Sequence, residues 1–328
     1  MADHDTLFDL QLDGRAPGQW HARVAELGNA LGRCESLGGR DLAVRLDAGR
    51  SLMVSFETIP AARRFNPEAA PRGWLVARAR GWSALTLLAD ARDSWFRDGA
   101  VHAYFDRLID AGYFEDFDRV LFFGAGGAGY AAAAYSVAAP EARVLAIRPQ
   151  ATLDPAQAAW DRRFLGQRAR DFTSRFGYAP QMLETASRAW ILHDPLVAED
   201  AMHATLFAAH NAMLLRTPHL GPTPERELAA MGVLDHLIDD AMAGTLDAAP
   251  FARHWRARRE HLPYLRTLFR QLDDDGRVGL LARLCRFLMH DSNRSLFADH
   301  TLAPNEAGRA GAAPRAATGH DTPDPGSV

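Results

Sequence analysis

Residues 120–134 of the chain read VLFFGAGGAGYAAAA. The stretch opens with four apolar residues, among them a β-branched valine, as is typical of a buried strand. Glycines then mark a tight turn, and the alanines that follow are strong helix formers. The stretch therefore predicts a buried strand, a tight turn and a helix, and we expect the rest of the chain to be organised around it.

One interpretation of this turn is a phosphate-binding loop. Gly124, Gly126 and Gly129 match the pattern G-x-G-x-x-G, in which glycines let the backbone approach the pyrophosphate of a dinucleotide at a helix N-terminus. The next predicted strand is followed by Arg148, a residue type that accommodates the 2′-phosphate of NADP. The pattern thus leaves an NADP-binding protein open as an alternative.

A second interpretation is a nucleophile elbow, G-x-S-x-G, which places a catalytic side chain on a sharp strand-to-helix turn. Gly126 would then occupy the position of the nucleophile, and Gly127 would offer its amide to an oxyanion. In chain order such a site has its acid after a later strand and its histidine after the last strand. Asp194 and Asp200 follow the predicted strand at 190–192, and His219 follows the predicted strand at 212–215.

Strands and helices alternate along the chain, which predicts an α/β fold with a mostly parallel sheet covered on both faces. Further strands are predicted at 42–47, 51–57, 83–90 and 143–147, and a short irregular one at 74–80. The turn residues Asp47-Ala-Gly-Arg50 predict that the first two of these strands form a hairpin. Helical periodicity is found at 20–31, 99–111 and 198–209, and a polar, arginine-rich helical region runs to about 185.

The composition changes along the chain and suggests four parts. Residues 1–40 form an N-terminal segment, and residues 41–222 form the α/β domain. From 223 to 300 the pattern is helical only, and we expect a helical extension packed on that domain. Residues 301–328 are rich in Ala, Gly and Pro with little to bury, so we expect a disordered tail.

The charges of the chain exclude several classes of function. All basic residues are arginines, so the chain has no P-loop lysine, no Schiff-base lysine and no lysine general base. The net charge of −4 gives no general attraction to nucleic acids. Cys34 and Cys285 stand apart and form no C-x-x-C, so neither a disulfide framework nor a zinc site is expected. We therefore expect no metal and no cofactor.

The hydropathy of the chain predicts a soluble protein. No stretch approaches the roughly 18 unbroken apolar residues of a membrane span. The first residues, Met1-Ala-Asp-His-Asp5, are acidic, unlike the basic start of a secretory signal. We therefore expect a cytoplasmic protein.

Three segments resemble one group of proteins. The elbow at 123–130 with its alanine-rich helix resembles the G-x-S-M-G-G-Y-A-A elbow of α/β-hydrolase-like proteins encoded near bacterial surface-polysaccharide genes. The loop at 149–155 resembles their P-Q-x-x-x-D-P loop, and 200–203 resembles their D-x-x-H-A segment. The resemblance runs from about residue 52 to 221, and it implies a bacterial protein with an α/β-hydrolase-like three-layer sandwich and a C-terminal helical extension.

The resemblance also implies roles for individual residues. Gly126 holds the position of the nucleophile, Asp200 or Asp194 that of the acid, and His219 that of the base. Further residues for the oxyanion or ligand are Gly127, Thr58, Tyr130 and Gln150. Because glycine has no side-chain oxygen, covalent acyl transfer at this elbow is excluded, and we expect a pseudoenzyme with a binding or assembly role.

The sequence leaves the ligand, the oligomeric state and an alternative function open. The ligand would be a small molecule or an acyl, glycan or nucleotide group, and the oligomeric state is not determined. The alternative function is a hydrolase in which His219 and Asp200 activate water against an ester or thioester.

A related group of bacterial proteins with such elbows and helical extensions is often named phosphoadenosine phosphosulfate reductase. That enzyme requires an S-G-G-x-D-S loop and a cysteine in an E-C-G-x-H-like tail. Here Leu37 and Leu42 flank Gly38-Gly39-Arg40-Asp41, and Cys285 lies in Arg-Leu-Cys-Arg. The motifs of the reductase are thus absent.

Overall fold

The computed structural model describes residues 10–91 and 94–289. The described residues up to Thr267 form one compact unit, and a second unit begins at Leu268. Helix α12 (Leu262–Asp274) crosses this boundary, and α13 (Val278–Met289) lies in the second unit. No helix in the described ranges has the length and apolarity required to cross a membrane.

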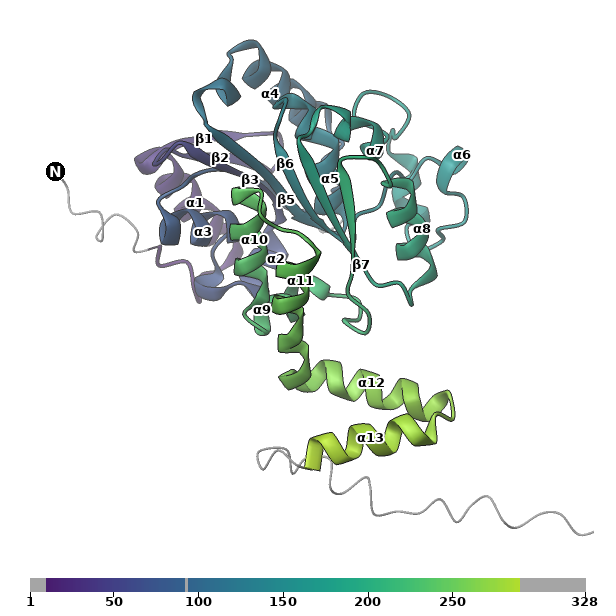
Figure 1. Cartoon of the computed structure of the whole chain (residues 1–328). Coiled ribbons are helices and arrows are strands. Elements are labelled where there is room, and N and C mark those ends of the chain that lie inside the picture. The colour runs from purple at the N-terminus through teal and green to yellow at the C-terminus, as the bar shows by residue number, and fades with distance from the viewer. Residues whose placement is uncertain (1–9, 92–93, 290–328) are drawn as a thin grey trace, which may run out of the picture. The chain divides into compact units, whose positions relative to one another are not determined.

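The first unit is built on a sheet of eight strands with the order β1-β2-β4-β3-β5-β6-β7-β8 (Figure 1). β2 pairs antiparallel with both β1 and β4, whereas every pairing from β4 to β8 is parallel. The strands are β1 (Gly32–Ser36), β2 (Leu42–Leu46), β3 (Ser51–Thr58), β4 (Ser83–Ala89), β5 (Arg119–Ala125), β6 (Arg143–Ile147), β7 (Arg188–His193) and β8 (Ala212–Arg216). The predicted α/β class with a mostly parallel sheet is confirmed.

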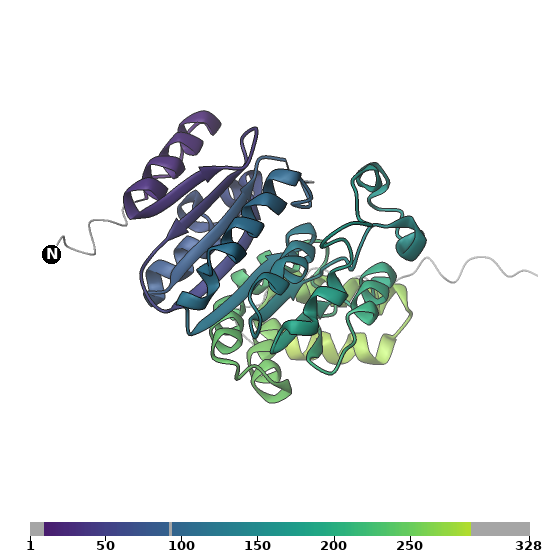
Figure 2. The same ribbon diagram turned by 90° about the horizontal axis from the view of Figure 1, so that it is seen from above.

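Helices cover both faces of this sheet, as Figure 2 shows from above. On one face α1 (Pro17–Leu31) and α3 (Arg72–Arg80) bury Trp20 and Trp74 in a core with β2 and β4. On the other face α4 (Gly99–Asp110) and α5 (Gly127–Tyr135) form an aromatic core over β3, β5 and β6. β4 contributes Ala84 to the first core and Leu85 to the second, because successive side chains of a strand point to opposite faces.

The remaining helices of the first unit follow the strands. They are α2 (Ile59–Phe65), α6 (Pro155–Ala158), α7 (Ala179–Met182), α8 (Ala198–Leu206), α9 (Pro224–Ala230), α10 (Val233–Ala243) and α11 (Ala248–His254). Of the helices in the expected extension from residue 223, α9 to α11 lie in the first unit. The expected disordered tail at 301–328 lies outside the described residues.

The predicted hairpin between the strands at 42–47 and 51–57 is wrong. β4 lies between β2 and β3 and pairs with both of them, in opposite senses. The turn that was taken for a hairpin is held instead at the start of β4, where the Ser83 hydroxyl accepts from the amide of Ala48 and donates to the carbonyl of Gly49. The turn residues between β2 and β3 therefore do not determine which strand pairs with β2.

The predicted strand at 74–80 is also wrong, because this segment forms helix α3. The carboxylate of Glu57 accepts hydrogen bonds from the amides of Arg72 and Gly73, at 2.9 and 3.1 Å. These bonds satisfy two of the amides that a helix leaves free at its start. Gly81, with a φ of 66°, ends the helix in the left-handed conformation.

Two other segments differ from expectation. β1 was not predicted, since its five residues have no apolar alternation that distinguishes them from a loop. The helical region expected up to about 185 contains only short turns, including α6 and α7. Arginine-rich composition indicated a helix there, but the segment is held by the side-chain network described below.

Close packing of α5 on the sheet depends on glycine. A Cβ atom added to Gly124, within β5, would lie 2.2 Å from the carbonyl oxygen of Ala128. One added to Gly129 would lie 3.3 Å from the carbonyl oxygen of Ile147, at the end of β6. The first contact is with backbone, which cannot move aside without shifting the helix.

We predict that Gly124→Ala destabilises the protein by about 1–3 kcal/mol or more, because the added methyl group overpacks against the backbone of α5. The matched control is Gly18→Ala, an exposed position in α1 where an added Cβ meets nothing within 4 Å. The control should leave stability unchanged or raise it slightly, since alanine favours helices. Thermal unfolding of both variants provides the measurement, and equal melting temperatures would contradict the prediction.

Candidate functional site

The turn after β5 has the backbone of a nucleophile elbow. Gly126 has φ 60° and ψ −127°, a combination that is strained for any residue with a side chain. Its amide donates to the carbonyl of Ile147 at 2.9 Å, and its carbonyl accepts the first hydrogen bond of α5, from Tyr130 at 3.0 Å. The sharp turn is therefore fixed by β6 on one side and by α5 on the other.

The first turn of α5 offers backbone amides at this edge of the sheet. An α-helix leaves its first amides without partners inside the helix, and Gly127 and Ala128 are the first two residues of α5. Trp95 packs over this turn, since a Cβ added to Gly127 would lie 3.3 Å from its indole ring. The ring of Phe164 meets that indole edge-on, with the two ring centroids 5.1 Å apart.

Arg148 follows β6 and lies beside the elbow. Its Nη2 atom is 3.8 Å from the place that a Cβ atom of Gly126 would occupy. Arg148 has a positive φ of 51°, and its amide donates to the carbonyl of Leu192 at 2.7 Å. Within the described chain, no carboxylate forms an ion pair with its guanidinium. Burial lowers the pKa of Arg148, and the charge of Asp200 partly opposes this effect.

A cavity of about 830 Å³ opens above the elbow. It lies at the carboxyl ends of β3, β5 and β6, the edge where parallel α/β sheets bind their ligands. Gly126, Gly127 and Arg148 line it on the sheet side, and α9 with the loop before it lines the other side. Its aromatic lining consists of Phe56, Phe65, Trp95, Phe96 and Phe164.

Ionisable groups from β3 and α3 also line the cavity. The buried carboxylate of Glu57 accepts from Asn66 at 2.9 Å as well as from the two amides of α3. Burial raises the pKa of Glu57. Arg72 lies beside it and is buried, and its Nε atom has no hydrogen-bond partner among the described residues.

Glu225, at the start of α9, faces the same cavity from another element. Its burial, together with the negative charge of Glu57, raises its pKa to about 7. Arg72 lowers the pKa of Glu225, but by less than these two effects raise it. Glu225 is therefore a carboxyl group that titrates near neutral pH inside the cavity.

The structure brings Asp194 and His219 together, but through the backbone of the histidine. Asp194 follows β7, and its Oδ2 atom accepts from the amide of His219 at 2.9 Å. The imidazole of His219 packs against the ring of Tyr264, with the ring centroids 5.8 Å apart, and burial lowers its pKa. Neither Asp194 nor His219 is among the described residues that line the cavity.

Asp200 has a different partner. Its buried carboxylate accepts from Nη1 of Arg163 at 2.6 Å. Arg163 also binds the buried carboxylate of Asp161 with its other nitrogens, at 2.8 and 3.0 Å. These charge-assisted bonds tie the segment after β6 to helix α8. Burial by itself would raise the pKa of Asp161, but the hydrogen bonds from His203 and Arg163 lower it.

His203 completes this network and is fully buried. Its Nδ1 atom accepts from the amide of Ala151 at 3.1 Å, so its proton is on Nε2, which donates to Asp161 at 2.9 Å. The ring of Trp160 covers the imidazole at a centroid distance of 4.5 Å. Both ring nitrogens of His203 thus take part in holding the fold.

The other predicted ligand residues lie as follows. Thr58 lines the cavity, and its hydroxyl accepts from the amide of Ala61 at the start of α2. Tyr130 is buried and donates to the carbonyl of Phe176 at 2.6 Å. Gln150 is buried and donates to the carbonyl of Arg148 at 3.3 Å, while its side-chain oxygen has no partner in the described part of the chain.

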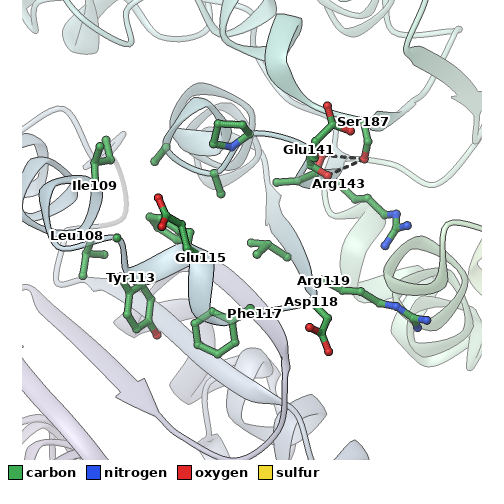
Figure 3. Close-up of a pocket in the computed structure, with 17 residues that line it drawn as sticks. Leu108, Ile109, Tyr113, Glu115, Phe117, Asp118, Arg119, Glu141, Arg143 and Ser187 are labelled. Carbon is green, nitrogen blue, oxygen red and sulfur yellow. Dashed lines mark hydrogen bonds between the residues drawn. The ribbon is translucent and has the colours of Figure 1, made fainter.

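A second cavity, of about 690 Å³, lies at the amino ends of β5 and β6 (Figure 3). Figure 3 shows both acidic and basic side chains around it, among them Glu115, Asp118, Arg119 and Arg143. The guanidinium of Arg143 donates a hydrogen bond to the carbonyl of Met242 at 2.8 Å. Since this cavity is at the opposite end of the strands from Gly126, it plays no part in the site at the elbow.

Sequence reasoning assigned no role to Glu57, Arg72 or Glu225. Glu57 ends the predicted strand at 51–57, and this position at the carboxyl end of a strand could have identified it as a candidate site residue. Glu225 begins a helix far away in the sequence, and no comparable pattern points to it. Arg148 was noted only as a partner for NADP, although its place after a strand puts it at the carboxyl edge. Within the described ranges, no three His, Cys, Asp or Glu side chains are grouped as a metal site would require.

Comparison with known proteins gives no sequence family. No family model matches the chain, and no curated protein matches it. Among solved structures, the chain is similar to a capsule O-acetyltransferase of Neisseria meningitidis serogroup A, with 11% identity over 61% of this chain and 93% of that one and a TM-score of 0.36.

Two esterases give similar values. The esterase domain of a Rhodothermus marinus protein is 13% identical over 59% of this chain and 89% of that one, with a TM-score of 0.38. The Pyrobaculum calidifontis esterase is 12% identical over 75% of this chain and 95% of that one, with a TM-score of 0.39.

The order and pairing of the strands identify the fold of the chain. An eight-stranded, mostly parallel sheet lies between two layers of helices, with a sharp elbow after β5. An aspartate follows β7 and a histidine follows β8, in the chain order typical of such elbows. The chain has the α/β-hydrolase fold, with Gly126 at its elbow.

Proposed function

We propose that the cavity above Gly126 binds a small organic anion with an apolar body, such as a fatty acid or another acyl-derived carboxylate, and does not cleave it. This proposal rests on one observation above all: the guanidinium of Arg148 lies beside the elbow, and no carboxylate of the described residues pairs with it. A half-buried cation is costly to desolvate unless an anion compensates it. A ligand carboxylate at this place would supply that compensation.

The surroundings of Arg148 support an anion rather than a neutral ligand. The first-turn amides of α5 point to the same edge, and a helix N-terminus favours negative charge. Asp200 is the carboxylate whose charge acts most strongly on Arg148, but its hydrogen bond goes to Arg163. Among residues 10–91 and 94–289, no acceptor takes the guanidinium donors of Arg148, so they are available to a ligand.

The walls of the cavity support an apolar body. Aromatic rings of β3, of the segment at 95–96 and of Phe164 lie next to the elbow. Small-molecule sites are commonly built in this way, with apolar walls and a few polar groups that fix orientation. An aliphatic or aromatic carboxylate matches both features.

The absence of cleavage follows from the elbow. Gly126 has no side chain to attack a carbonyl, and Arg148 lies next to the space where such a side chain would project. Ser136 cannot take its place, since it is buried and donates to the carbonyl of Ala133 at 2.8 Å. The imidazole of His219, the proposed base of the alternative hydrolase, packs on Tyr264.

We predict that octanoate binds and that Arg148→Gln weakens its binding at least roughly tenfold, because charge-assisted hydrogen bonds are lost. Isothermal titration calorimetry gives the two dissociation constants. Arg216→Gln is the matched control, since Arg216 is an exposed arginine at the end of β8 that does not line the cavity. The control should bind octanoate like the unmodified chain.

The same titration tests the other ligand classes. If octanoate fails to bind, or binds equally to the Arg148 variant, the proposal is overturned. Binding of NADP without binding of octanoate would favour the dinucleotide interpretation of the glycine-rich turn instead. Binding of a neutral sugar that is insensitive to Arg148→Gln would also contradict an anion site.

A second prediction concerns chemistry. A fluorophosphonate probe, which labels activated serines, should leave the protein unlabelled, and a panel of esters and thioesters should not be turned over. Mass spectrometry of the intact protein and product assays are the measurements. Turnover that is lost in both His219→Ala and Asp200→Asn would establish the alternative hydrolase and refute a role limited to binding.

A further inference from the structure

The lining of the cavity contains a pair of acidic side chains in unequal surroundings. Glu57, at the end of β3, has three N–H donors on its carboxylate. Glu225, at the start of α9, has no hydrogen bond to any described residue, and it lines the cavity. The two groups are close enough for the charge of Glu57 to act on Glu225.

The hydrogen bonds decide which of the two groups keeps its negative charge. A carboxylate that accepts several N–H bonds is stabilised in its charged form. Glu57 is such a group, whereas no residue that the structure describes donates to the carboxylate of Glu225. When two neighbouring carboxyl groups cannot both ionise, the proton therefore stays on Glu225.

Arg72 does not remove this difference between the surroundings of Glu57 and Glu225. It is the positive group that acts on Glu225, but it forms no ion pair with it, and its buried Nε atom has no partner in the described chain. Its terminal nitrogen approaches Asp235 of α10 only at 3.9 Å. Arg226, which also lines the cavity, lies over the ring of Phe65, with its guanidinium carbon 5.5 Å from the ring centroid.

We propose that Glu225 is a ligand-contacting residue that admits the organic anion only in its uncharged, carboxylic acid form, so that anion binding is coupled to the uptake of one proton. This inference rests on the proposed function of the cavity. In its charged form Glu225 adds a second negative charge beside Glu57, which repels the ligand anion, and in its acid form it adds none. The proton comes from solvent and stays on the Glu225 carboxyl group.

The expected pH dependence has a definite sign. Glu225 titrates near pH 7, so the affinity for octanoate should be constant at lower pH and fall above about pH 7. The fall reaches at most roughly tenfold per pH unit, because one proton is linked to binding. Octanoate itself stays ionised throughout this range, since free carboxyl groups titrate near pH 4.

The test is calorimetry with octanoate between about pH 6 and pH 8.5, on the full chain. Glu225→Gln, which resembles the protonated acid in shape, should bind octanoate with an affinity that no longer depends on pH. Glu184→Gln changes an exposed glutamate away from the cavity and serves as the matched control. That control should keep the pH dependence of the unmodified chain.

The outcomes separate the two proposals. If the unmodified chain binds octanoate and Glu225→Gln shows the same fall with pH, proton coupling at Glu225 is refuted while the anion site stands. If octanoate does not bind at any pH, the proposed function itself fails.

Stability gives a second readout without a ligand. The pKa of Glu225 is raised above its ordinary value of 4.5, so its contribution to stability is full below about pH 4.5 and is lost as the pH rises towards 7. Glu225→Gln should therefore melt at a higher temperature than the unmodified chain at about pH 8, and the difference should shrink at about pH 5. An equal difference at both values would contradict a titrating Glu225.

Discussion

The contact of α5 with the ends of β5 and β6 is the constraint on which the site depends. Gly124 leaves no room for a Cβ atom against the backbone of Ala128, and Gly129 leaves little against Ile147. This close approach forces the chain to turn sharply at Gly126 and brings the amides of α5 to the carboxyl edge of the sheet. The same edge receives Arg148 from β6, so one packing contact positions both halves of the candidate anion site.

The charges around this edge divide into two groups with different tasks. Asp161, Arg163 and Asp200 are bound to one another and, through His203, to the backbone of the segment after β6. Their bonds hold that segment in place. Arg148 and Glu225, by contrast, line the cavity, and neither side chain forms an ion pair or a hydrogen bond with another residue in the described part of the chain. The paired groups thus support the site, and the side chains of Arg148 and Glu225 are available to a ligand.

The sequence was most informative where local physics decides the structure. The glycine-rich turn, the alternation of strands and helices and the order of Asp194 and His219 along the chain predicted the fold class. The turn at 47–50 was misleading because the choice of neighbour for β2 depends on β4, which follows much later in the chain. Likewise, the helix at 72–80 depends on a carboxylate from β3, which no local pattern around Trp74 reveals.

The site was harder to predict than the fold. A pattern of matched positions pointed to Asp200 and His219, but it contains no information on which atom of each residue faces which partner. Asp200 binds Arg163, and His219 meets Asp194 with its amide rather than with its ring. Glu225 could not be found from sequence, because its pKa depends on burial and on Glu57 from a distant strand.

The cavity joins parts of the chain that are far apart in sequence. One wall comes from β3, α2 and the start of α3, and the other from the residues around α9, which follow the last strand. A molecule held between these walls would act as a noncovalent cross-link, closing a loop that includes most of the sheet. Occupancy would then restrict the separation of early and late segments during unfolding, so the cavity is a point where a ligand can control how cooperatively the whole first unit opens.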